Sequence, residues 1–332
     1  MPGVRALRKI QLGVESAKGT AVAATALWRG QGVIEDQTEV MFPEEDIGYL
    51  SGIDRSYIPR NMAAITFEQT PATFEQLGYI LDAGVKTVSG VQDGAGTDYI
   101  YTYTFPTTAA NSIKTYTIEG GDDQQAEEME YAFVKSFTLA GAAGEAWTVT
   151  ADWLGRQVST TSFTGSISVP TVEEILFQKG KLYIDAIGGT IGSTQKSNTL
   201  LKAELAVTTG WQEYFTADGN LYFTAHKSTK PEVVLTLTFE HDGTSVAEKA
   251  NWLAETARLI RILVEGSTVA TPGTTYSNKT LIIDLAGKWE RFEKLDEQDG
   301  NDIVAGRFRS AYDPTSASFA EIAIVNELSA LP

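Results

Sequence analysis

Short runs in which apolar and polar residues alternate recur along the chain, and this period of two is typical of β-strands. Lys9–Glu15, Met62–Glu68 and Tyr99–Phe105 show the alternation most plainly. Glycine-rich breaks separate the runs, and Thr, Val, Ile, Tyr and Phe are frequent within them. The pattern predicts a protein that is mainly β.

Further strands are expected in both halves of the chain. Leu27–Val40 reads as a second strand with an irregularity at Gly30 and Gly32. The short glycine-containing segment AGAAGE predicts a hairpin between the two strands that flank it. The other expected strands are Ile113–Glu119, Met129–Leu139, Trp147–Trp153, Lys181–Ile187, Leu200–Val207, Arg258–Val264, Thr280–Leu285 and Ile303–Ser310.

Two helices are expected, each after a strand. A Gln-Thr-Pro break follows Met62–Glu68, and a helix from about Ala72 would place Phe74, Leu77 and Leu81 on one face. The second helix, Ser245–Ala257, opens on an Asp-Gly-Thr-Ser turn that is able to cap it. Its inner stripe is expected to consist of Val246, Leu253 and Ala257.

The segment Pro59–Leu81 is repeated as Pro231–Leu253. The two prolines are 172 residues apart (231 − 59), as are Thr66 and Thr238 and the two final leucines. Such long-period similarity indicates one unit built twice. We therefore expect two β-sandwich or barrel domains, each with a flanking helix, over residues 1–156 and 172–332. A polar junction, residues 157–171, joins them, and part of it could pair as an extended segment.

A long loop rich in aromatic residues precedes the repeated segment in both halves. Loops that are both apolar and charged are usually functional or contact-forming, although these side chains could also fold back on their own domain. Two such loops at equivalent places favour a shared task. The candidate contact residues are Phe42, Ile47, Tyr49, Leu50, Tyr57, Trp211, Tyr214, Phe215, Tyr222 and Phe223.

The composition is that of a globular protein. The chain has 332 residues, 42% of them hydrophobic and 21% charged, which is enough for two domains. No run is long and apolar enough for a membrane helix, and the N-terminus does not resemble a secretory signal. The absence of cysteine excludes disulfides, thiolate metal sites and cysteine nucleophiles.

The formal net charge of −17 keeps the chain soluble and repels polyanions. A protein that reads nucleic-acid sequence usually carries a basic stripe, and none is found here. The charge fits either an ordinary soluble acidic protein or a surface that DNA passes without sticking.

No pattern points to catalysis or to a cofactor. His226 and His241 belong to no recognisable catalytic motif, and the run IGGTIG (187–192) leads into no helix, so it is a poor phosphate cradle. The acidic loop LDEQDGND (295–302) departs from the standard Ca²⁺ loop and favours a hairpin turn, although a Ca²⁺ site is conceivable. We expect no catalytic residue, no metal and no cofactor.

The opening of the chain resembles the start of siphophage tail tube proteins. There a short strand leads through a Glu-Ser-x-x-Gly-Thr-Ala-Val-Ala-Ala turn into the second strand. The corresponding residues are Glu15, Ser16, Gly19, Thr20, Ala21, Val22, Ala23 and Ala24. The order strand, strand, long loop, strand, helix and further strands is also similar to the tube fold, and the two units resemble the duplicated members of the family.

The resemblance implies a structural, non-enzymatic virion protein of the phage tail, assembled in the host cytoplasm. Three chains would close a ring with pseudo-sixfold symmetry, with six chains as the second choice. Strands of adjacent domains would join into one barrel, and the long loops would reach the neighbouring ring. The implied partners are other copies of the chain, a tape measure protein and a tail terminator. DNA would pass through the lumen during ejection without specific binding.

Two other function classes remain open. A baseplate or fibre protein that recognises glycans on the cell surface would use the aromatic loops as ligand platforms. A β-rich enzyme would need a catalytic cluster, which the sequence does not display.

Overall fold

The structure is a computed structural model that describes residues 3–331. It is mainly β, as predicted, with two α-helices in this part of the chain. None of the described helices is long and apolar enough to cross a membrane. The elements of the first half are β1 (Lys9–Val14), β2 (Ala26–Leu27), β3 (Ile34–Asp36), β4 (Ala63–Pro71), α1 (Leu77–Gly84), β5 (Val91–Gln92), β6 (Tyr99–Thr104), β7 (Tyr116–Gly121), β8 (Ala126–Ala142), β9 (Thr148–Gly155) and β10 (Val158–Thr161).

The second half begins after a 3₁₀ turn at Phe177–Lys179, and a similar turn, Arg5–Leu7, precedes β1. Its elements are β11 (Gly180–Ala186), β12 (Gln195–Lys196), β13 (Leu200–Thr208), β14 (Trp211–Tyr214), β15 (Ala225–Ser228), β16 (Glu232–Glu240), α2 (Gly243–Leu253), β17 (Arg258–Thr268), β18 (Asn278–Phe292), β19 (Asp296–Gln298), β20 (Asn301–Ser310) and β21 (Ala320–Asn326).

Six strands follow one another in the same spatial order in each half, and all their pairings are antiparallel. The first half has the order β3-β4-β9-β8-β7-β1. The second half has the order β13-β16-β20-β18-β17-β11. In the first half the longest strand, β8, also pairs with β10, the strand that comes next in the chain after these six. In the second half the longest strand, β18, pairs in the same way with β21.

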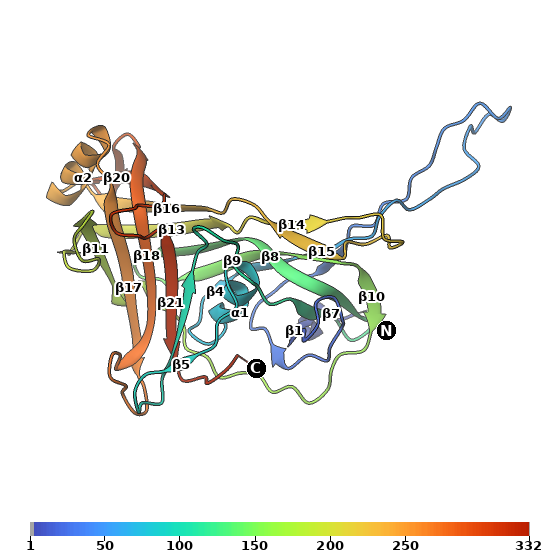
Figure 1. The fold of residues 1–332 in the computed structure, drawn as a ribbon, viewed down its shortest axis with the longest axis horizontal. Helices are drawn as coiled ribbons and strands as arrows, with labels where there is room; N and C mark the ends of the chain where they lie inside the picture. Colours follow the sequence, from blue (N-terminus) through green and yellow to red (C-terminus); the bar gives the residue numbers. More distant parts are fainter. Residues whose placement is uncertain (1–2, 332) are drawn as a thin grey trace.

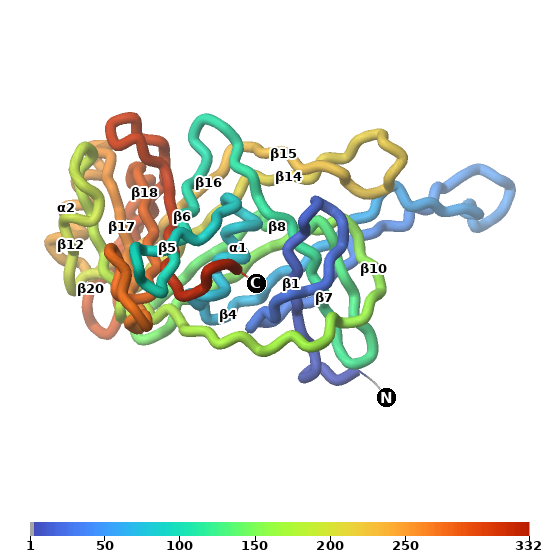
Figure 2. The backbone as a smooth tube through the Cα atoms, turned by 60° about the horizontal axis from the view of Figure 1, so that its bottom comes forward, coloured from blue at the N-terminus to red at the C-terminus, as the bar shows by residue number. Residues whose placement is uncertain are grey.

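The two halves are joined by strand pairing at two places. Residues 136–142 of β8 pair with β13, and β6 pairs with β21. One hydrophobic cluster runs through both halves, from Ile10 and Leu12 to Ile322 and Ile324. Figures 1 and 2 show the result as a single body from which one long loop projects. The predicted junction is partly paired, because β10 lies beside β8.

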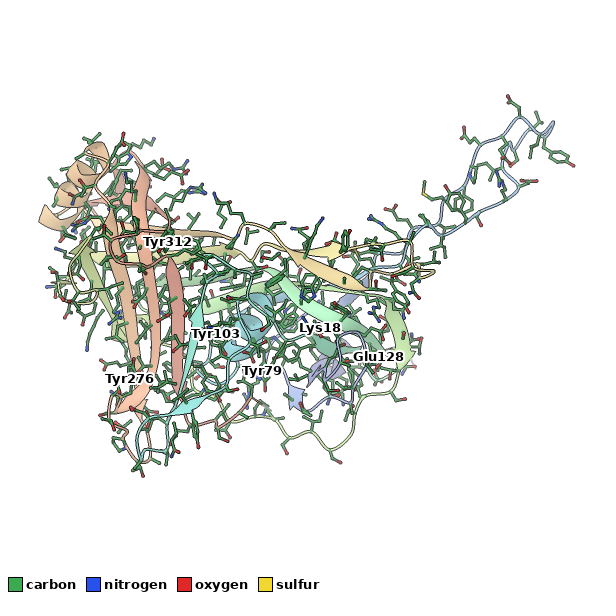
Figure 3. The ribbon with its side chains drawn as sticks, viewed as in Figure 1. Lys18, Tyr79, Tyr103, Glu128, Tyr276 and Tyr312 are labelled. Atoms are coloured by element: carbon green, nitrogen blue, oxygen red, sulfur yellow. The ribbon has the colours of Figure 1, made fainter. Side chains whose placement is uncertain are left out.

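The two helices differ in how they are covered. Every residue of α1 is buried, and Tyr79 of α1 and Tyr103 of β6 both lie inside the body (Figure 3). In α2 only Ser245 and Glu248 are fully buried. The predicted inner stripe of α2 is therefore wrong, since Val246 and Leu253 are exposed.

The inward face of α2 is polar and is stabilised by specific partners. The Glu248 carboxylate accepts from the Arg258 guanidinium at 2.9 and 3.1 Å and from the Trp289 indole at 2.9 Å. The predicted cap is confirmed, because the Asp242 carboxylate accepts from the N–H groups of Thr244 and Ser245. A count of apolar positions alone misses a buried face of this kind.

Several strand and helix boundaries also differ from the prediction; α2, for example, ends at Leu253 and not at Ala257. Leu27–Val40 is not one strand: β2 ends at Leu27, the chain bends at Arg29 and Gly30, and β3 begins only at Ile34. Between them, a side chain at Gly32 would meet the Thr66 carbonyl. The Gln-Thr-Pro segment is part of β4, with a bulge before Thr70, and α1 begins only at Leu77. In place of Ile113–Glu119, β7 covers Tyr116–Gly121.

Candidate contact surface

Residues 37–61, which we call the arm, leave the body between β3 and β4 and project far beyond it (Figures 1 and 2). The two sides of the arm are held together at Met41 and Tyr57, which exchange backbone hydrogen bonds of 2.8 and 3.1 Å. Nearer the tip, the Arg55 guanidinium donates to both oxygens of Glu45 at 2.5 and 3.2 Å. The arm is thus an ordered, two-sided extension.

The arm carries an unusual concentration of exposed apolar side chains. Phe42 is 60% exposed, and Ile47 is half-buried. Contiguous apolar exposure of this kind marks a contact surface, because it is unfavourable in water. The structure therefore does not fold these side chains back on their own domain. The exposed residues are Val40, Met41, Phe42, Tyr49, Leu50, Ile53, Tyr57 and Ile58.

The second aromatic loop, residues 209–229, forms a hairpin of β14 and β15 that lies on the first half of the chain. The Trp211 indole N–H donates to the carbonyl of Gly84, the last residue of α1, at 2.9 Å. Trp211 and Phe223 are buried in one cluster. The prediction that they contact a neighbouring molecule is therefore wrong for these two residues. The other buried members of the cluster are Ile113, Tyr131, Phe133 and Leu154.

Arg156, just after β9, holds the hairpin against the first half. Its guanidinium donates to the carbonyls of Phe223 at 3.1 Å and Gly19 at 2.9 Å. It also lies over the rings of Tyr222 and Tyr131, 4.6 and 5.0 Å from their centres. Tyr222 thus takes part in a contact within the chain and is half-buried. Tyr214 and Phe215 remain exposed.

His226 lies under the hairpin, in an environment that disfavours its charged form. Its Nδ1 is 3.2 Å from the Tyr131 hydroxyl, and its Nε2 is 3.3 Å from Nζ of Lys18, which is labelled in Figure 3. Burial, and then the charge of Lys18, lower the pKa of His226 to about 4. The neighbouring rings of Trp211 and Phe133 make this a packing site.

The two loops therefore lie in different surroundings. They touch at one point, where the Asn61 N–H donates to the Leu221 carbonyl at 2.8 Å. Beyond that point the hairpin covers the end of α1. The exposed side chains of the arm have no surface within residues 3–331 to pack against.

Among the strand edges that lack a partner within the described residues, two correspond to edges that pair with each other inside the chain. β3 pairs only with β4, although β13, at the matching place in the second half, pairs with both β16 and β8. Residues 288–292 of β18 pair with β20 on one side. On the other side they have no partner strand within the described residues, because the pairing with β17 stops at Gly287. Unpaired edges invite a further strand.

The other segments considered in the sequence have internal roles. In the loop that contains IGGTIG, the N–H groups of Gly192, Ser193 and Thr194 donate to the Asp185 carboxylate, so a side chain of the protein occupies this anion cradle. The acidic loop 295–302 is the β19–β20 hairpin. Within residues 3–331 no three His, Asp or Glu side chains lie close enough to hold a metal ion.

A groove of about 660 Å³ lies between residues 106–110, 228–232 and 309–312. Its charged side chains are Lys230, Glu232 and Arg309, and the last two form an ion pair. The groove contains no histidine and no pair of a nucleophile with a base.

A scan against models of protein families found no match for the chain, and a search of curated proteins found none either.

Proposed function

We propose that the chain is the structural subunit of a long-tailed phage's tail tube, non-enzymatic, with two tandem tube domains and three chains in each ring. The rings stack around a channel through which DNA passes. In the virion the partners are further copies of the chain, a tape measure protein and a tail terminator.

The matching strand orders support the duplication on which this proposal depends. β1 and β11 contain Lys9 and Lys181, which are 172 residues apart (181 − 9). Their partners in β7 and β17, Gly121 and Leu263, are only 142 apart (263 − 121). The first half has β5 and β6 between its helix and β7, and no strand lies between α2 and β17. This extra segment accounts for the change in spacing.

The observation that carries the ring is the pairing of β13 with β8. This pairing joins the second unit side by side to the first. The outer edge of the equivalent strand of the first unit, β3, and the equivalent edge of the second unit, at β18, both lack a partner strand within residues 3–331. A chain with two different complementary edges associates head to tail, and such contacts make a ring when the rotation closes. Closure also removes the exposed edges.

The charge and the arm fit the same proposal. A lumen rich in Asp and Glu repels phosphates, so DNA slides through it, whereas a basic channel would grip DNA through counterion release. The tip of the arm, with Tyr49 and Leu50 exposed, projects away from the body (Figure 1), and in the proposed tube it would contact the next ring.

Electron microscopy of the purified protein tests the proposal. We expect rings or open-ended tubes with threefold symmetry and six similar lobes in end-on views. Rings of six whole chains would contradict the trimer. A stable monomer that binds glycans would contradict the tube and favour a baseplate or fibre protein.

A further inference from the structure

We infer that the C-terminal end of α2 is a docking site for a second copy of the chain. The part of the second copy that docks is the base of its arm, around Phe42, and its Phe42 packs on Leu253. This inference rests on the proposed ring and names the residues that close it.

The hairpin supplies the template for the contact. In the second half, β13 leads into Trp211, which covers Gly84 at the end of α1 in the first half. Sheet register gives the equivalent residue in the arm. Ile34 of β3 pairs with Ile65 of β4, and Ala203 of β13 pairs with Leu237 of β16. Since Ile65 and Leu237 occupy equivalent places, β3 and β13 are 169 residues apart (203 − 34).

The strand spacing gives one member of the contact, and the helix ends give the other. Trp211 is 169 residues after Phe42 (211 − 42), which is the spacing that relates β3 to β13. Gly84 and Leu253 are the last residues of their helices. The pair formed by Trp211 and Gly84 within the chain thus predicts a pair formed by Phe42 and Leu253 between chains.

Both residues of the predicted pair are exposed. Leu253 is 72% exposed, and Phe42 is 60% exposed. The helix end that bears Leu253 lies against the unpaired edge of β18, because the Trp252 indole donates to the Glu290 carbonyl at 3.1 Å. The equivalent edge of β8 is where β13 pairs just before the chain reaches Trp211. A second copy that brought β3 to the β18 edge would therefore bring Phe42 to Leu253.

The matching also explains why Leu253, at the end of α2, faces outward. The second half of the chain covers the end of α1. Within residues 3–331 nothing covers the equivalent end of α2, so Leu253 stays exposed. A second copy of this chain is the one occupant that carries the equivalent covering element.

Site-specific cross-linking tests the pair, because the chain has no cysteine of its own. The double variant Phe42→Cys/Leu253→Cys, treated with a short bis-maleimide, should give covalent trimers on a denaturing gel. The matched control Tyr49→Cys/Leu253→Cys, with its first cysteine at the arm tip, should give at least tenfold less. Threefold rings without preferential cross-linking of the first variant would overturn this inference and leave the proposed function standing. A protein that stays monomeric would overturn both.

A mixing experiment gives a second readout that does not depend on linker geometry. Phe42→Glu disables the arm of one chain, and Leu253→Glu disables the docking site of another. Each variant alone should stay monomeric by light scattering. Mixed in equal amounts, they should form a dimer capped at two chains, because one intact arm meets one intact helix end. Rings formed by either variant alone would contradict the contact. Circular dichroism confirms folding, and both substitutions lie on the surface.

Discussion

The indole N–H of Trp211, in the second half of the chain, donates to the carbonyl of Gly84, in the first half, at 2.9 Å. Carbonyls in the last turn of a helix have no partner within the helix, so this bond satisfies one of them. Trp211 therefore closes α1 and fixes the hairpin to the first half at the same time.

We predict that Trp211→Phe lowers the free energy of unfolding by about 1 kcal/mol, because it leaves the buried Gly84 carbonyl without its donor. Trp211→Ala should cost about 3–5 kcal/mol, since a cavity is added to the lost bond. Urea unfolding followed by circular dichroism measures both values. The exposed Tyr214, on the same strand, provides the control: Tyr214→Ala should change stability by less than about 0.5 kcal/mol. Equal losses at Trp211 and Tyr214 would show that the hairpin is not docked as described.

Acid should weaken the docking of the hairpin through His226. Its pKa is lowered to about 4 in the folded protein, from an ordinary value of 6.5. The folded state therefore binds fewer protons than the unfolded state between these values. Stability is complete above pH 6.5 and falls as the pH drops towards 4, by on the order of 2 kcal/mol after allowance for partial exposure.

The variant His226→Gln should remove this part of the pH dependence, as measured by thermal unfolding at pH 7, 5.5 and 4. His241, which is exposed, gives the matched control, and His241→Gln should keep the wild-type profile. If the two variants had the same profile, the buried imidazole would not be the group responsible.

The sequence pattern predicted the positions of the strands and helices better than it predicted which side chains are buried and what they contact. Alternation located β1, β6, β11 and β13 to within a residue or two, because apolar core residues alternate with polar residues in the sequence of each. The strand β21 was missed: Ala320–Asn326 is almost entirely buried and shows no alternation. The hairpin and the arm looked alike in sequence, since both are long, polar and aromatic.

What separates the two loops is long-range contact. Arg156 and Gly84 bind the hairpin, and they are 67 and 127 residues away from their partners in the chain. Local pattern carries no information about such pairs. Trp211 and Phe223 were therefore predicted as surface residues although they are buried. The composition of α1 carried a signal for this contact: Asp82 is its one charged residue, so the helix needs a covering element around most of its surface.

A third prediction concerns a buried carboxyl at the contact of the two halves. Asp98 is 0% exposed, and neither of its oxygens has a hydrogen-bond partner among the described residues. Burial raises its pKa, and so do the nearby charges of Asp93 and Glu327. The folded state thus holds this proton more tightly than the unfolded state, so the charged form at neutral pH costs stability.

Asp98→Asn should therefore raise the free energy of unfolding by about 1–3 kcal/mol at pH 7. The gain should shrink as the pH falls towards 3.8, where the wild-type carboxyl is protonated in the folded state. Thermal unfolding across this range measures it. Asp93→Asn is the control with the opposite sign, because Asp93 accepts from the N–H groups of Thr275 and Tyr276 at 2.7 Å each. A loss of stability on Asp98→Asn would mean that the charged form has a partner in solution.

The last prediction separates the tip of the arm from its base. Deletion of residues 47–58 removes Tyr49, Leu50 and Tyr57, and every hydrogen bond that the structure gives this segment is to another residue of the arm. The body should therefore keep its urea midpoint. Phe42 is retained, so rings should still close, but they should not stack, because the tip is the part that extends beyond the body.

Electron microscopy of the deletion variant should show single rings in place of tubes. The variant Tyr49→Ser/Leu50→Ser keeps the length of the arm and controls for a change of reach. If it also gives single rings, the apolar side chains make the stacking contact; if it gives full tubes while the deletion does not, the backbone of the arm does. Tubes of unchanged length and yield from the deletion variant would mean that rings stack through the body, and the arm would then act only within a ring.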